Sequence, residues 1–523
     1  MKNNLLLIFC FCFFIITNVN AQYGPVTYHL QKSKSLSKIS SDPTPAGNSI
    51  QEIIIIGDTI LTSSRGLNIS TDGGTSWQNF YGTSDFGSDG VYSIGYDDGV
   101  IWAATGQRYY DSDLQQSIDK GTGYRVSTDM GNTWRTILQP VDSDSDTIIV
   151  YGINNLRALP VTVTDQNVTF DLAFTQGTVW AASFAAGLRK STDNGQTWQR
   201  VVLPADYLEH ISPSDTLNYC YSPVAGSVCS QGFLNLEGFS VLAVDDTTLY
   251  VGTAGGINKS TDGGISWTKF SHGSQQNSIS GNWVTFLDYN LSNNTVWAST
   301  WRAEGPDELY GISATSDGGT NWSVYLPDVR SYNFGFKGNQ VIASTDDGAF
   351  RSSDDGRTWI LPTSIYDSES KVKLTTTIFY DAGVNGNTIW LGSEQGLVKL
   401  NETGGMWQGN WKIFRASSNL ESNDMTYAFP NPFLPKTTTN KVEIVYSTGG
   451  NSVPVTIRIF DFGMNYVRTI IQNVTKGSSS NLSERDYWDG KDDNGNLVSN
   501  GVYFYRIDRG SSEPIFGKIL VIK

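Results

Sequence analysis

A short motif of the form Ser-x-Asp-x-Gly-x-x-Trp recurs along this chain and constrains its fold more than any other feature. Six near-perfect copies occupy residues 70–77, 127–134, 191–198, 260–267, 315–322 and 352–359. A seventh, altered copy at 400–407 carries Glu402 at the Asp position and Gly404 at the Gly position. Because a recurring motif of this kind marks a repeat architecture, each copy is expected to belong to one supersecondary unit.

Two short runs of β-branched or aromatic residues precede each motif, and both are typical of strands. The first runs cover 60–63, 101–104, 179–182, 249–252, 296–299, 341–344 and 389–392. The second runs open with a glycine, at Gly66, Gly123, Gly187, Gly256, Gly311, Gly348 and Gly396. With one strand before these runs and one after the Trp, each unit has four strands. Seven such units predict an all-β fold, a seven-bladed β-propeller over residues 50–415.

The acidic residue of the motif is expected to shape a tight turn between the third and fourth strands of each unit. An aspartate can accept backbone N–H groups in such a turn, and the glycine supplies a positive φ. An identical residue in every unit cannot form one localized catalytic or metal site. We therefore assign a structural role to Asp72, Asp129, Asp193, Asp262, Asp317 and Asp354.

The motif resembles the Asp-box, or BNR, repeat of sialidases, sortilins, certain endoglucanases and the photosystem II assembly factors. The resemblance covers residues 50–415 and implies the propeller fold. It implies no single activity, since these families bind and cleave unrelated molecules on one scaffold. The sequence has no F-R-I-P sialidase motif and no HExxH or GxSxG motif. We assign no catalytic residue, no metal site and no cofactor.

The N-terminus has the pattern of an export signal. Lys2 precedes an apolar run at 5–16, which is too short to span a bilayer, and Ala21 fits a cleavage site. We predict a signal peptide at 1–21, an N-terminal segment at 22–49, and no integral membrane segment in the mature chain. In an exported protein, Cys220 and Cys229 are expected to form a disulfide.

A polar linker is expected at 416–426, followed by a β-sandwich at 427–523 with short strands and Gly and Asn turns. Pro430-Asn431-Pro432-Phe433, Gly501-Val502-Tyr503-Phe504 and the last six residues, 518–523, carry a further resemblance. They resemble the FlgD-like immunoglobulin domain and the C-terminal sorting domains of the type IX secretion system. This implies the type IX machinery as a partner and a secreted or outer-membrane surface location.

Long insertions mark the expected binding face. They lie at 106–122, 135–167, 199–237 and 300–310, and the repeat pattern places all of them opposite the Asp boxes. The expected ligand-binding residues are Trp283, Trp301, Arg302, Glu304, Asp307, Glu308 and Tyr310 near the fifth unit, with Arg108, Tyr109 and Tyr110 on the second. Aromatic side chains beside charged groups suit sugar rings or extended peptides. The alternative is that Trp283 and Trp301 only cap the core of the fifth unit.

The formal net charge of −15 argues against nucleic acid as a partner. We therefore expect non-enzymatic binding of an extracellular glycan or protein through the long-loop face. A glycoside hydrolase using Glu304, Asp307 or Glu308 is one alternative, and it requires two carboxylates flanking a cleft. An assembly or adhesion factor outside the cytoplasm is the other.

Overall fold

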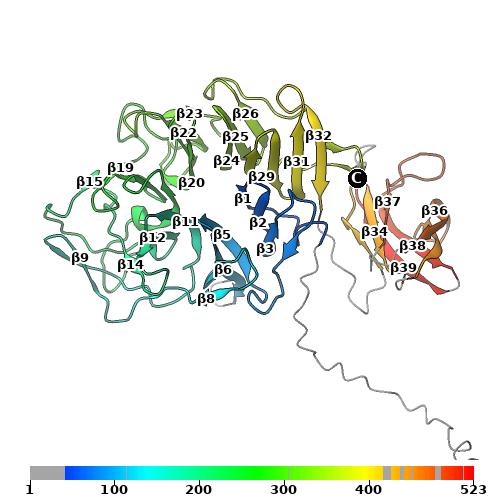
Figure 1. The fold of residues 1–523 in the computed structure, drawn as a ribbon, viewed down its shortest axis with the longest axis horizontal. Coiled ribbons are helices and arrows are strands. Elements are labelled where there is room, and N and C mark those ends of the chain that lie inside the picture. Colours follow the sequence, from blue (N-terminus) through cyan, green and yellow to red (C-terminus); the bar gives the residue numbers. More distant parts are fainter. Residues whose placement is uncertain are drawn as a thin grey trace, which may run out of the picture. The chain divides into compact units, whose positions relative to one another are not determined.

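The structure is a computed structural model that describes residues 42–112, 115–303, 305–370, 372–415, 426–435, 441–448, 451–477, 484–510 and 512–523 (Figure 1). The expected signal peptide, the segment 22–41 and most of the expected linker lie outside the described residues. The chain divides into two units, 1–40 and 41–523, of which only the second is described. Within it, strands predominate, and the short 3-10 helix Leu234–Leu236 is the one helix among the described residues.

Successive sheets, which we call blades one to seven, follow one another between Glu52 and Phe414. Blade one has β1 (Glu52–Ile56), β2 (Thr59–Ser63), β3 (Leu67–Ser70) and β4 (Gln78–Asn79). Blade two has β5 (Gly90–Asp97), β6 (Val100–Asp111), β7 (Gln116–Ser127) and β8 (Arg135–Ile137). Blade three has β11 (Thr169–Thr175), β12 (Thr178–Ser183), β13 (Gly187–Ser191) and β14 (Gln199–Arg200).

The remaining blades vary at their outer edges. Blade four has β16 (Gly238–Ala243), β17 (Leu249–Thr253), β18 (Gly256–Ser260) and β19 (Trp267–Phe270), with β15 (His210–Ile211) added outside. Blade five has β20 (Trp283–Asn290), β21 (Thr295–Trp301), β22 (Gly311–Thr315) and β23 (Ser323–Tyr325). Blade six has β24 (Ser331–Lys337), β25 (Gln340–Thr345) and β26 (Gly348–Ser352). Blade seven has β29 (Phe379–Asn385), β30 (Thr388–Ser393), β31 (Gly396–Glu402) and β32 (Gly409–Phe414), with β27 (Tyr366–Asp367) and β28 (Val372–Lys373) outside.

The first strand of each blade contacts the first strand of the next. The contacts run from β1 to β5, β11, β16, β20, β24 and β29, and β29 returns to β1. Figure 1 shows several of these strands arranged around a common centre. A closed ring of antiparallel sheets is a β-propeller, so the predicted all-β propeller fold is confirmed.

Side-chain packing closes the ring between blades seven and one. The backbone N–H of Ile50 donates to the carbonyl of Ser393 at 3.0 Å, and Lys399 Nζ donates to the carbonyl of Gly73 at 2.8 Å. A Cβ atom on Gly74 would lie 2.3 Å from the Trp390 ring, so the glycine allows the two blades to meet. Each blade is built from one continuous stretch of chain, and none of the described strands is exchanged across this joint.

The Asp-box turns share one set of hydrogen bonds. In the first, Ser70 Oγ accepts the N–H of Gly74 at 2.9 Å and donates to Asp72 Oδ1 at 2.9 Å. The N–H of Ser76 donates to Asp72 Oδ1 and its hydroxyl to Oδ2, at 2.9 and 2.6 Å. Equivalent bonds lower the pKa of Asp193 to about 2, because they stabilise the carboxylate. The box aspartates thus use their acceptor sites within their own turns.

The altered seventh copy joins two blades instead of forming a box turn. Glu402 is nearly buried and accepts from Arg351 Nη1 at 2.6 Å and from Lys337 Nζ at 2.7 Å. The backbone N–H of Trp407 donates to Glu402 Oε1 at 2.8 Å. Since Lys337 and Arg351 belong to blade six, a longer acidic side chain here supports the contact between blades six and seven.

Two of the long insertions lie partly at the outer edge of the propeller, which corrects the expectation that all of them gather opposite the boxes. The hairpin of β9 (Ile148–Tyr151) and β10 (Asn154–Arg157) packs with the insertion at 199–237. Tyr151 Oη donates to the carbonyl of Ile265, inside the Asp box of blade four. The insertions have their own apolar core, which includes Ile149, Leu156, Leu203, Tyr219, Tyr221 and Phe233. The Cys220–Cys229 disulfide lies in this region.

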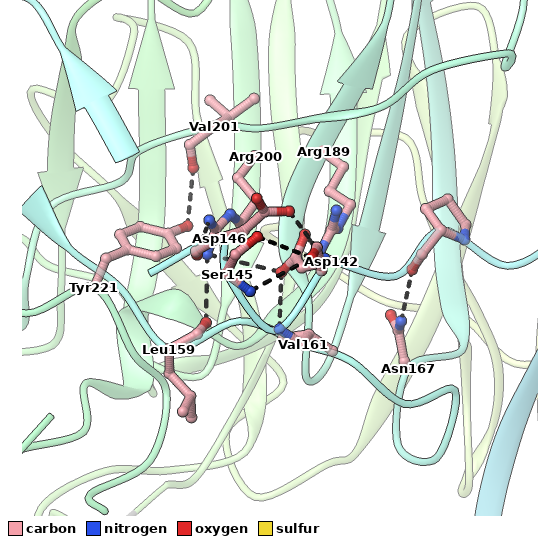
Figure 2. A network of polar contacts seen from close by, with 12 residues as sticks. Asp142, Ser145, Asp146, Leu159, Val161, Asn167, Arg189, Arg200, Val201 and Tyr221 are labelled. Atoms are coloured by element: carbon pink, nitrogen blue, oxygen red, sulfur yellow. Dashed lines mark hydrogen bonds and ion pairs between the residues drawn. The ribbon is translucent and has the colours of Figure 1, made fainter. Parts of the chain in front are cut away.

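A nearly buried carboxylate attaches the first of these insertions to blade three (Figure 2). Asp142 Oδ1 lies 2.8 Å from Arg189 Nη2, and its Oδ2 accepts the N–H of Val161 at 2.8 Å. Arg200 adds an ion pair at 3.7 Å and donates to the carbonyl of Asp146 at 2.7 Å. The side chains of Asp142, Arg189 and Arg200 are all under a tenth exposed. The insertion is therefore held by an internal ionic network.

The C-terminal residues form two sheets around a separate core. One contains β33 (Thr426–Phe429), β34 (Val442–Tyr446) and β37 (Glu484–Trp488); the other contains β35 (Val453–Phe460), β36 (Tyr466–Lys476), β38 (Gly501–Arg509) and β39 (Ser512–Val521). Alternate residues of both sheets meet in one apolar cluster, which includes Ile444, Tyr446, Ile457, Ile459, Tyr505 and Ile519. Two sheets that share one core form a β-sandwich.

Candidate functional site

Glu308, a predicted ligand-binding residue, instead holds the blade-five loop together. Its Oε2 accepts the backbone N–H groups of Asn282 at 3.1 Å and Ala303 at 2.7 Å. Its Oε1 accepts the Gly305 N–H at 3.2 Å and Asn282 Nδ2 at 2.8 Å. The side chain is almost fully buried, and both of its oxygens accept hydrogen bonds from the loop and Asn282. Arg302 and Asp307 are exposed on this loop, and Glu304 lies outside the described residues.

Trp283 and Trp301 are paired across β20 and β21, as expected for residues that emerge at the same end of blade five. The indole N–H of Trp301 donates to the carbonyl of Ser331 at 2.7 Å. This bond links blade five to blade six, so Trp301 has a structural contact as well as a half-exposed ring. The indole nitrogen of Trp283 is buried with no hydrogen-bond partner in the described part of the chain.

Arg330, which the sequence did not single out, lies between two aromatic rings of this region. Its guanidinium carbon is 4.9 Å from the Trp301 ring centroid and 4.8 Å from that of Tyr310. Nη2 donates to Tyr310 Oη at 3.2 Å. The predicted residues Trp301 and Tyr310 are therefore brought together, and their common partner is a cation from the start of blade six.

The second predicted cluster lies on the long β6–β7 hairpin. Arg108 forms a two-point contact with Asp119, with Nε to Oδ1 at 2.8 Å and Nη2 to Oδ2 at 2.9 Å. These hydrogen bonds hold the pKa of Asp119 below its usual range. Tyr109 donates to Asp165 Oδ1 at 3.2 Å, and Tyr110 is 66% exposed. A cavity of about 400 Å³ next to Arg108 is also lined by Gln51, Ser64, Tyr92 and Gln107.

A row of half-buried aromatic side chains runs from this hairpin to blade seven. We call it the aromatic arc, and it consists of Tyr92, Phe170, Phe239, Trp283, Trp301, Tyr332 and Tyr380. Ring centroids are 6.4 Å apart for Tyr92 and Phe170, 6.1 Å for Phe170 and Phe239, 5.8 Å for Phe239 and Trp283, 5.7 Å for Trp301 and Tyr332, and 5.2 Å for Tyr332 and Tyr380. Tyr92 also donates to Asp119 at 2.7 Å, so the arc reaches both predicted clusters.

The arc was missed because it depends on β-bulges. Register shifts occur in the first strands of blades two, three, four, six and seven, at or beside Tyr92, Phe170, Phe239, Tyr332 and Tyr380. A bulge changes the direction of a side chain relative to its neighbours, and nothing in the residue type indicates where it falls. The one available signal was an aromatic residue at or near the start of the first strand in blades two to seven.

Carboxyl groups line the central cavity, which has a volume of about 510 Å³. The backbone N–H groups of the following blade donate to three of them: Ile94 to Glu52 at 2.7 Å, Val241 to Asp171 at 2.9 Å, and Ile53 to Asp381 at 2.5 Å. Asp288 accepts the N–H of Tyr289 within its own strand. Burial raises the pKa of Asp171 and of Asp288 to about 7, and raises the pKa values of Glu52 and Asp381 well above their usual range.

These raised pKa values predict that the propeller loses stability as pH increases from 5 to 8. Between the unfolded and folded pKa values of Asp171 and Asp288, the folded state holds more protons, so the free energy of unfolding falls as pH rises. Asp288→Asn keeps the acceptor for Tyr289 and removes the ionisation. We expect the decline between pH 5 and 8 to shrink by about 1 kcal/mol or more, measured by denaturant unfolding.

The variant Asp171→Asn is the comparison for this test. In the wild type, both carboxyl oxygens of Asp171 accept backbone N–H groups. An amide nitrogen would face one of those donors, so this variant should be less stable than the wild type at every pH. A pH dependence that is identical in the wild type and Asp288→Asn would contradict the expected ionisation.

The fold and this face define a β-propeller with aromatic side chains gathered at the start of its innermost strands. No protein-family model matches the chain, and no curated protein matches it. Among solved structures, an ancestral GH74 enzyme matches with a TM-score of 0.50 and 15% identity, over 91% of this chain and 62% of that chain. At this identity, the likeness shows the propeller fold alone.

Two further solved structures are less similar. PorZ, a surface component of the type IX secretion system of Porphyromonas gingivalis, matches with a TM-score of 0.38 and 14% identity, over 91% of this chain and 66% of that chain. YCF48 bound to a D1 peptide matches with a TM-score of 0.40 and 14% identity, over 69% of this chain and 95% of that chain. The chain therefore spans less than two thirds of the length of PorZ and of the GH74 enzyme.

The described residues contain no group of three or more His, Cys, Asp or Glu side chains placed to hold a metal ion. Within the same residues, no helix has the length and apolar composition needed to cross a bilayer.

Proposed function

We propose that this protein binds an extracellular ligand, without catalysis, through the face that carries the aromatic arc. The observation that carries the proposal is the arc itself. Ring contacts link Tyr92 to Trp283 and link Trp301 to Tyr380, and Trp283 and Trp301 are cross-strand partners in β20 and β21. Half-buried aromatic rings on a rigid scaffold provide apolar contact area at a small cost in side-chain entropy.

The contacts of Glu308 weaken the case for a glycoside hydrolase. A hydrolase of this type needs two carboxyl groups on either side of the scissile bond. Glu308 is buried and accepts four hydrogen bonds from its own loop and Asn282. Asp307 is the remaining candidate among the described residues of that loop. Binding therefore accounts for this surface with fewer assumptions than cleavage does.

We also propose that the protein reaches the cell surface or the medium through its terminal segments. The pattern at 1–21 supports export, and the sequence resemblance of residues 427–523 supports engagement of the type IX machinery. The separate core of the C-terminal sandwich fits a module that acts independently of the binding face.

Substitution of the arc tests the binding proposal. Tyr332→Ala and Phe239→Ala remove rings that contact neighbours on two sides. For a ligand found by screening the purified protein on glycan arrays, we expect each variant to weaken binding about tenfold or more in titrations. Tyr207→Ala removes a 62% exposed ring from an insertion outside the arc and should leave binding unchanged.

A reducing-sugar assay accompanies the screen. Product release by the wild type would establish the hydrolase instead. Glycan binding that survives both arc substitutions would contradict the proposed face. Failure on all glycans, with capture of a specific protein, would favour the assembly or adhesion alternative.

A further inference from the structure

Arg330 is a cation held in a fixed position within the proposed binding face. Trp301 and Tyr310 contact its guanidinium at 4.9 and 4.8 Å, and Tyr310 accepts a hydrogen bond from Nη2. An arginine held in this way has already lost much of its side-chain freedom, so binding an anion costs little further entropy. Cation–π contacts stabilise the charge without using its remaining hydrogen-bond donors.

Arg330 also lacks the directly bonded carboxylate that three buried arginines of the propeller have. Arg125 pairs with Asp89, Arg189 with Asp142, and Arg351 with Glu402. Among the described residues, no carboxylate is in direct contact with Arg330. The charge of Asp346 acts on Arg330 from a greater distance, and the Arg330 Nε–H has no acceptor. In a chain with a net charge of −15, a preorganised guanidinium without a directly bonded carboxylate is a candidate for ligand recognition.

The neighbouring surface favours a sugar over a peptide strand. A peptide that adds to a sheet edge needs free backbone groups. On the inner strands of blades five, six and seven, the N–H groups of Tyr289, Phe334 and Ala382 already donate to side-chain oxygens of the preceding residues. Recognition therefore relies on side chains, and here those are aromatic rings beside one guanidinium. Pyranose rings pack on aromatic faces, and a carboxylate on the sugar matches the guanidinium fork.

We propose that Arg330 binds the carboxylate of a uronic acid in an extracellular polysaccharide, with Tyr332 and Tyr380 packing against the adjoining sugar rings. This inference rests on the proposed function and adds the ligand class. The ring centroid of Tyr332 lies 5.7 Å from that of Trp301, and the ring centroid of Tyr380 lies 5.2 Å from that of Tyr332. Arg330 provides one guanidinium, so the proposed site needs only one carboxylate on the bound sugar.

Galacturonate and glucuronate oligomers, each compared with its methyl ester, are the probes. The ester keeps the sugar ring and removes the charge. We expect the full-length protein to bind the acid at least tenfold more tightly than the ester in calorimetric titrations. Arg330→Gln should equalise the two affinities, and Arg330→Lys should restore only part of the preference, since an ammonium cannot form the two-point contact.

Two other variants test whether the preference for the acid depends on Arg330 and its aromatic neighbours. Arg65 stacks on Tyr81 at 4.3 Å but lies outside the arc, so Arg65→Gln should keep the preference for the acid. Tyr310→Leu leaves the charge and removes one wall of the clamp, so binding of the acid should weaken severalfold. Thermal melts of each variant identify any that fail to fold.

The inference and the proposed function can fail separately. Equal binding of acid and ester by the wild type, or an unchanged preference in a folded Arg330→Gln variant, overturns the uronate assignment. If Tyr332→Ala still abolishes binding of a glycan in that case, the binding face stands. Binding of neither probe, or tighter binding of a glutamate-rich peptide than of any uronate, also overturns the assignment.

Discussion

Replacing Trp390 with Ala should lower the free energy of unfolding of the propeller by about 3–5 kcal/mol. The indole is 2% exposed and fills the joint between blades seven and one. It meets Trp77 edge-on at 6.5 Å, stacks on Phe414 at 5.7 Å, and lies under Lys399 Nζ at 4.9 Å. Because side chains from both blades pack at this joint, a cavity at this position removes contacts from both.

Denaturant unfolding, followed by tryptophan fluorescence, measures this loss. Tyr110→Ala, which removes a 66% exposed ring from the β6–β7 hairpin, is the control and should change stability by less than about 0.5 kcal/mol. If Trp390→Ala unfolds at the same denaturant concentration as this control, the joint does not depend on the indole.

Asp142→Ala should be similarly costly, about 3–5 kcal/mol, because it leaves two buried guanidinium groups without their carboxylate. Arg189 and Arg200 are 5% and 9% exposed at the side chain, and solvent cannot readily replace Asp142. The variant should also release the insertion at 135–167, since the N–H of Val161 loses its acceptor. Limited proteolysis should then cut this insertion before the blades.

Asp144→Ala provides a matched comparison, because Asp144 is exposed two residues away. It should resist proteolysis as the wild type does. Asp142→Asn keeps an acceptor for Val161 but not the charge, so its stability should fall between the two. An Asp142→Ala protein with wild-type stability and the wild-type digestion pattern would falsify the anchoring role.

The repeated parts of the fold were predictable from local sequence. The predicted second runs begin at the residues where β13, β18, β22, β26 and β31 begin, namely Gly187, Gly256, Gly311, Gly348 and Gly396. A strand next to a fixed turn is determined by residues a few positions away. Its residue pattern can therefore be recognised in a single sequence. In blade two, β7 begins at Gln116, before the predicted Gly123, because the hairpin with β6 extends outward.

The site was less predictable because its parts depend on contacts between blades. Glu308 and Asp307 are both acidic, yet only the first is enclosed by backbone donors of its own loop. Arg330 gains its position from Trp301 and Tyr310 of the preceding blade, and no local pattern indicates that stacking. The path of the insertion at 135–167 depends on an apolar core shared with residues far along the chain.

The absence of strand exchange at the joint between blades seven and one, described above for Gly74 and Trp390, bears on how such a ring can change over evolutionary time. Each described blade is one uninterrupted stretch of chain as well as one sheet. Tandem duplication or deletion of a segment between two Asp boxes therefore adds or removes a whole sheet and leaves every other hydrogen-bonded pairing intact. The duplicated segment then corresponds to one structural unit, and the loops of a new blade can diverge without disturbing the older blades.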